Sequence, residues 1–115
     1  MAGPTNPSEL WWNAPQTNSD GSNLVDLKEY HVLVGPEATG PWTQVQVVQA
    51  ASLDPSAGEQ VFVQTSNWPL LTPGQYYATV RSVDTAGNPS VLATPVPFVV
   101  GDDVAPSPPS NLSFA

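Results

Sequence analysis

The sequence predicts an all-β protein built as a sandwich of two packed sheets. Short segments in which apolar and polar residues alternate with period two recur along the chain, which is typical of half-buried strands. Turn-forming residues separate these segments, since the 115 residues include 14 Pro and 8 Gly. No segment shows the 3.6-residue period of a helix. Several short strands around one core are therefore the expected architecture.

Composition narrows the range of functions. Ten acidic and two basic residues give a net charge of −8, and phosphate binding needs clustered Lys and Arg, so no nucleic acid partner is expected. The chain has no Cys and hence no disulfide, thiol nucleophile or thiolate metal site. No apolar run approaches the ~18–20 residues of a membrane span, so membrane insertion is not expected.

The first strand is expected over residues 10–15. Leu10 and Trp12 share one face of this segment, Trp11 lies on the other face, and Pro15 ends the strand. A polar loop that is rich in turn-forming residues follows. The aromatic face should therefore point into a core that later strands complete.

Four further strands follow from the same alternation. They are expected over residues 28–35, 42–51, 60–64 and 92–100. The last of these contains two prolines, which suits an edge strand, because a missing N–H there removes no ladder hydrogen bond. Loops that contain Gly, Pro, Asn or Ser separate the strands, as a sandwich with short connections requires.

The remaining strand, residues 76–83, follows a distinctive turn. Pro73 fixes its own φ angle at a value that suits the turn, and Gly74 can adopt the positive φ angle that follows. Tyr76 comes just after the turn, so we expect its ring to be buried and its hydroxyl to bond the corner backbone, as in the tyrosine corner of sandwich domains.

Several short motifs occur in a specific order and spacing, although each is weak alone. They are Leu10-x-Trp12-x-Ala14-Pro15, Asp20-Gly21, Tyr30-x-Val32, Leu71-x-Pro73-Gly74-x-Tyr76 and Gly87-Asn88-Pro89-Ser90. With these motifs, residues 10–100 resemble a fibronectin type III domain, an immunoglobulin-like two-sheet sandwich. The resemblance implies that Trp12, Tyr30 and Tyr76 lie buried between the sheets.

The chain departs from the family pattern at both ends. Residues 1–9 form a Pro-rich lead-in that leaves little room for the first strand of the family, strand A, so this strand is expected to be missing or short. Residues 101–115 form a Pro-rich linker and a segment that resembles the opening of a strand A. This segment is expected to pair with a neighbouring domain or subunit, through Pro108, Leu112 and Phe114.

Three interpretations of these ends remain open. The chain is a piece of a tandem array and carries the beginning of its neighbour, or its tail donates a strand to the open edge of an identical subunit. In the third interpretation, the N-terminal residues form a short, irregular strand A and the tail is disordered. Self-completion is not expected, because residues 101–105 span at most about 17 Å.

No catalytic residue, metal site or cofactor is expected. His31, the single histidine, lies on an alternating strand, where a surface or cross-strand role is the default. Asp54 and Glu59 flank a turn, and nothing places them in a cleft as an acid–base pair would require. Asp102 and Asp103 would need further oxygen ligands to bind Ca²⁺.

Together these features imply a non-catalytic structural or assembly module, such as a spacer or repeat unit of an extracellular, cell-surface or virion protein. The first residues lack a signal peptide, which favours a virion component if the chain is complete. The competing interpretation is a carbohydrate-binding or glycoside-hydrolase-associated accessory module. In either case Trp11, Trp42 and Trp68 are candidate surface contacts, because exposed Trp stacks on sugars and anchors protein interfaces.

Overall fold

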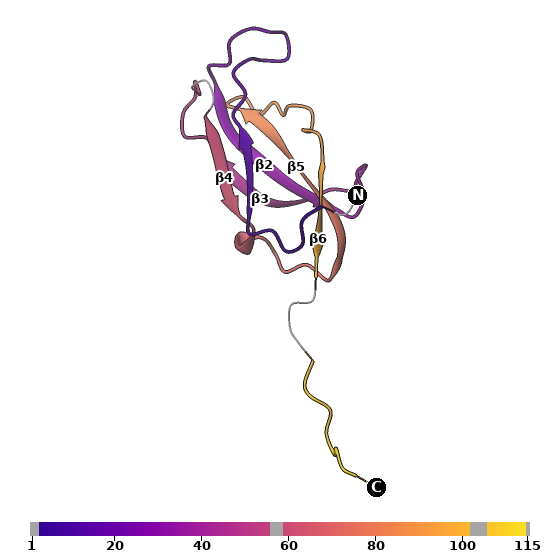
Figure 1. Ribbon diagram of the computed structural model, residues 1–115. Helices are drawn as coiled ribbons and strands as arrows, with labels where there is room; N and C mark the ends of the chain where they lie inside the picture. The colour runs from indigo at the N-terminus through magenta and orange to yellow at the C-terminus, as the bar shows by residue number, and fades with distance from the viewer. Residues whose placement is uncertain (1–2, 56–58, 102–105, 115) are drawn as a thin grey trace.

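The computed structural model describes residues 3–55, 59–101 and 106–114 (Figure 1). Within these ranges it contains six strands and one short 3₁₀ turn, Thr65–Asn67. The strands form two antiparallel sheets, so the all-β prediction is confirmed. In chain order the strands are β1 (Glu9–Asn13), β2 (Leu27–Gly35), β3 (Thr43–Gln49), β4 (Gln60–Gln64), β5 (Gly74–Asp84) and β6 (Val96–Val100).

The two sheets differ in size. One contains four strands in the order β3-β2-β5-β6, and the other contains only β1 and β4. In the larger sheet β2 and β5 are central, and the alternating apolar residues Tyr30, Val32 and Val34 of β2 are buried. The smaller sheet contributes Val63 to the same core, and Leu10 and Trp12 pack against it. The core therefore lies between the sheets.

The ends of the core are closed by aromatic contacts. Near one end, Trp12 and Tyr30 meet edge to face with ring centroids 5.2 Å apart. Near the other end, Tyr76 stacks on Phe98 at 5.7 Å. Tyr30 is almost completely buried, whereas Trp12 and Tyr76 are only partly buried, so the expected burial of all three rings holds fully for Tyr30 alone.

The hydrogen bond expected of a tyrosine corner is confirmed, although the Tyr76 ring is only partly buried. The Tyr76 hydroxyl donates a hydrogen bond to the carbonyl oxygen of Thr72 over 2.8 Å. The Thr72 hydroxyl lies 3.1 Å from the Tyr76 hydroxyl. The side chain thus ties the turn before β5 to the strand itself, as the residue spacing predicted.

The last strand is shorter than expected. It begins at Val96 rather than at residue 92, because Pro95 interrupts the ladder. The preceding segment still follows β5: the N–H of Ser90 donates to the carbonyl of Ser82, and the N–H of Ala93 donates to the carbonyl of Val80. Residues 90–93 therefore continue the edge of the larger sheet without forming a regular strand.

The N-terminal segment pairs with β6. Thr5 forms an isolated parallel bridge with Val99, with hydrogen bonds from Asn6 N–H to Val99 O and from Val99 N–H to Pro4 O. The Asn6 side chain also accepts a hydrogen bond from the N–H of Gly101. The N-terminal segment thus forms a single bridge rather than a regular strand, and it lies on β6 rather than on β1.

Candidate functional site

The structure places a gap between β1 and the edge formed by residues 90–93 and β6. Near the start of β1 the gap is covered by the N-terminal segment, where Pro4, Pro7 and Leu10 line a hollow of about 130 Å³. Near the end of β1 it is open. There, Trp12, Tyr30, Val91 and other residues line a hollow of about 330 Å³, which we call the Trp12 hollow.

Two residues that line the Trp12 hollow, Trp12 and Tyr30, each carry a buried polar atom. The indole Nε1 of Trp12 and the hydroxyl of Tyr30 are buried and make no hydrogen bond of regular geometry with the residues that the structure describes. Burial, with a smaller contribution from the Glu59 carboxylate, raises the pKa of Tyr30, whereas a weak hydrogen bond from the Trp12 indole lowers it. The hydroxyl therefore stays protonated at neutral pH.

The backbone of β1 is unpaired along the gap. Ser8 accepts a hydrogen bond from Thr65 N–H and Ala14 donates one to Glu59 O, so the even-numbered residues of β1 face β4. In an antiparallel ladder the alternate residues then direct their N–H and C=O groups outward. No strand among the described residues pairs with this side of β1. Trp11 and Asn13 thus present an open strand edge.

The predicted contact residues of the tail lie away from this edge. Residues 106–114 are exposed throughout and extend from the end of the sandwich at which β6 finishes (Figure 1). Leu112 is 94% exposed and Phe114 is 104% exposed, and Pro108 is exposed as well. The structure therefore does not bring Pro108, Leu112 and Phe114 to the open edge of their own chain.

The three candidate surface tryptophans have different environments. Trp11 is 55% exposed, as expected, and Trp42 is only partly buried. The expectation for Trp68 is wrong, because only 9% of it is exposed. Its ring contacts Phe98 edge to face, and its Nε1 donates to Gln46 Oε1 over 2.9 Å, which links the turn after β4 to β3.

Sequence reasoning missed one exposed aromatic residue. Phe62 is 54% exposed and lies directly opposite Trp11 in the β1–β4 ladder. The signal was present, since alternation with Val61 and Val63 places Phe62 on the outer face. Trp11 and Phe62 form an aromatic pair on the outside of the smaller sheet, on the face opposite the core.

The single histidine is engaged at both ring nitrogens. Arg81 donates from Nε to His31 Nδ1 over 3.1 Å, and Nε2 of the same ring bonds the Glu29 carboxylate. Nε2 therefore carries the proton in this arrangement. The hydrogen bond from His31 lowers the pKa of Glu29. His31 acts as the cross-strand residue that the sequence predicted.

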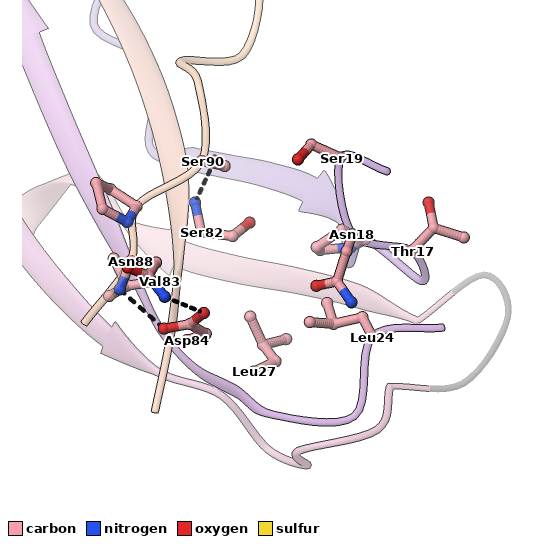
Figure 2. Close-up of a pocket in the computed structure, with 12 residues that line it drawn as sticks. Thr17, Asn18, Ser19, Leu24, Leu27, Ser82, Val83, Asp84, Asn88 and Ser90 are labelled. Atoms are coloured by element: carbon pink, nitrogen blue, oxygen red, sulfur yellow. Dashed lines mark hydrogen bonds between the residues drawn. The ribbon is translucent and has the colours of Figure 1, made fainter. Parts of the chain in front are cut away.

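A second hollow adjoins the Trp12 hollow. It has a volume of about 170 Å³, is floored by Leu24 and Leu27, and is drawn in Figure 2. On its rim, Asp84 accepts hydrogen bonds from the backbone and side chain of Asn88, and these bonds lower the pKa of the Asp84 carboxyl. Pro15, Ser82 and Ser90 line both hollows.

Within the described residues, no group of three or more His, Asp or Glu side chains is arranged to hold a metal ion. Asp54 pairs locally with Ser52 through their backbone and hydroxyl groups. The proposed calcium ligands Asp102 and Asp103 lie outside the described residues.

Comparisons with protein-family models, with curated proteins and with solved structures give no match for this chain. In the parts of the chain that the structure describes, no helix is long and apolar enough to cross a membrane. The described residues present an open strand edge at β1, the adjoining Trp12 hollow and an exposed tail that carries Leu112 and Phe114.

Proposed function

We propose that this chain is a non-catalytic structural or assembly module with a fibronectin type III-like fold. It acts as a spacer or repeat unit of an extracellular, cell-surface or virion protein, and it joins head to tail by donating its C-terminal strand to the next subunit. The partner is an identical subunit or the neighbouring domain of an array.

The fibronectin type III-like assignment is supported by three features. The smaller sheet pairs the first strand of the sandwich with the fourth, and the larger sheet places the central β2 and β5 side by side. Tyr76 forms the corner hydrogen bond that is typical of such sandwiches. Trp12 packs on Tyr30 between the sheets.

The observation that carries the assembly role is the pairing of an open edge with an exposed tail. β1 has outward-facing N–H and C=O groups, and strand addition to such an edge is a recurring mode of recognition. Leu112 and Phe114 are apolar and almost wholly exposed, which is costly for a chain that keeps them in water. Donating the tail to another subunit would bury both features together.

Sedimentation equilibrium tests this function. The mass of the full chain is compared with that of a variant lacking residues 104–115, over a range of concentrations. We expect the full chain to form species larger than one subunit and the shortened variant to remain a monomer of equal thermal stability. Two equally stable monomers would contradict the assembly role.

One observation favours a carbohydrate-binding role as the alternative. Trp11 and Phe62 form an exposed aromatic pair on the outer face of the smaller sheet, and aromatic faces stack on sugar rings. A polysaccharide pull-down separates the two functions. Binding that is lost in both Trp11→Ala and Phe62→Ala, and kept in Trp42→Ala, would support the accessory-module role.

A further inference from the structure

We propose that the Trp12 hollow and the adjoining edge of β1 accept residues 106–114 of a second copy of this chain. The inference rests on the strand-donation role proposed above. It adds the location of the acceptor site, the direction of the incoming strand and the side chains that fill the hollow.

The hollow has features that an incoming strand would satisfy. One wall is the Trp12 ring, and the other is formed by Val91 and Leu92, of which Val91 is 90% exposed. Tyr30 and Val80 also line the hollow. These walls are largely apolar, so the site suits an occupant with apolar side chains.

The tail has the matching chemistry. In an extended strand Leu112 and Phe114 share one face, while Asn111 and Ser113 share the other, which is the pattern of a half-buried strand. Residues 106–114 carry no charge, so their burial needs no ion-pair partner. Asn111 has a φ of 61° in the free tail, and pairing with β1 requires it to become extended.

Strand direction argues for a second copy rather than self-completion. β1 runs from the end of the core near Phe98 towards the end near Tyr30. β6 finishes opposite Gly74, at the former end. A tail that turned back from there would run parallel to β1, whereas the four ladders between named strands are all antiparallel.

A copy placed beyond the Tyr30 end can supply an antiparallel strand. Its tail leaves from the end at which its own β6 finishes (Figure 1). In the proposed contact this tail enters the gap beside Asn13 of the accepting copy. Each copy then donates at one end and accepts at the other, which is a heterologous contact that does not close. The predicted product is a linear, head-to-tail assembly.

The N-terminal segment leaves this site free. Its hydrogen bonds to β6 lie at Val99, and Pro4 and Pro7 cover only the hollow beside Leu10. The Trp12 hollow is not lined by any residue before Trp12 among the described residues. The donated strand can therefore enter without displacing the N-terminal bridge.

Three single substitutions of the full chain test the site by sedimentation equilibrium. Leu112→Asp damages the donor, Val91→Arg damages the acceptor, and Val47→Arg is the matched control, since Val47 is an exposed valine on β3. We expect Leu112→Asp and Val91→Arg each to weaken self-association roughly tenfold or more. Val47→Arg should associate like the unmodified chain.

Mixing the two damaged variants tests the direction of assembly. The Leu112→Asp variant keeps its acceptor and the Val91→Arg variant keeps its donor, so the mixture should form a dimer of one chain of each kind and nothing larger. A mixture that stays monomeric, or that forms long assemblies, would overturn the head-to-tail site.

The results separate the inference from the function on which it depends. A full chain that is monomeric at every concentration overturns both. Association that Leu112→Asp abolishes but Val91→Arg leaves unchanged keeps the strand-donating tail and overturns the Trp12 hollow as its acceptor. Loss in both variants, with the control unaffected, supports the site.

Discussion

The two strand edges that border the gap are protected to different degrees. The β6 edge contains Pro97, which lacks a donor, and the N-terminal segment bridges it at Val99. The β1 edge has no proline and no bridging segment among the described residues, and Glu9 is its only charged residue. Natural proteins usually protect exposed edges with prolines, charges or covering segments. The comparison shows that β1 is the less protected of the two edges, which is why we propose it as the acceptor edge.

The two neighbouring tryptophans of β1 provide the sharpest test of the sandwich. Trp12→Ala should lower the free energy of unfolding by about 3–5 kcal/mol, because its ring packs on Tyr30 in the core. Trp11→Ala is the control and should cost less than about 1 kcal/mol, the value of an exposed cross-strand pair. Urea unfolding measures both. Equal losses would contradict the assigned faces of β1.

The protection of the β6 edge can be weakened at one residue. Asn6→Ala removes the hydrogen bond from Gly101 N–H to the Asn6 side chain. The new residue must also adopt a φ of 47°, which Asn tolerates better than Ala. We expect a loss of about 1–2 kcal/mol in urea unfolding. A change within about 0.5 kcal/mol would mean that the N-terminal bridge contributes little.

A smaller loss of stability than that of Asn6→Ala is expected for the hydroxyl of Tyr76, which lies at the Phe98 end of the core. Tyr76→Phe keeps the ring on Phe98 and removes the hydroxyl that bonds Thr72, so it should cost about 1 kcal/mol. Tyr77→Phe, on the opposite face of β5, is the control for loss of a hydroxyl. Thermal unfolding of the two variants should rank Tyr76→Phe as the less stable.

The smallest effect is expected at the turn beside the open end of the gap. Hydrogen bonds from Asn88 lower the pKa of Asp84 below its ordinary value of 3.8. Its contribution to stability is therefore present above that value and is lost as the pH falls through the lowered pKa. Asp84→Asn should show a shallower loss of thermal stability below pH 4 than the unmodified chain. An identical pH profile would contradict this role.

Most of the fold was predictable because its determinants are local. The bounds of β4 match the expected residues 60–64, since alternation and flanking turns define them. The Tyr76 corner followed from its spacing after Pro73 and Gly74. Local patterns also identified the exposed face of Trp11.

The remaining features depend on contacts between distant residues. Trp68 lies in a segment without periodicity, so its burial depends on Gln46 and Phe98 and could not be inferred from neighbours in sequence. The bridge from Thr5 to Val99 likewise joins residues that are far apart in the sequence. The Trp12 hollow is the space that remains after these contacts form, so no sequence motif marks it.

Amide hydrogen exchange at β1 tests the central claim most directly. The N–H groups of Trp11 and Asn13 face away from β4, so they should exchange rapidly in dilute samples of the full chain. At concentrations where the sedimentation mass increases, these two amides should become protected, while that of Val47 on β3 stays unchanged. Assemblies that form without any change at Trp11 and Asn13 would contradict strand donation to β1.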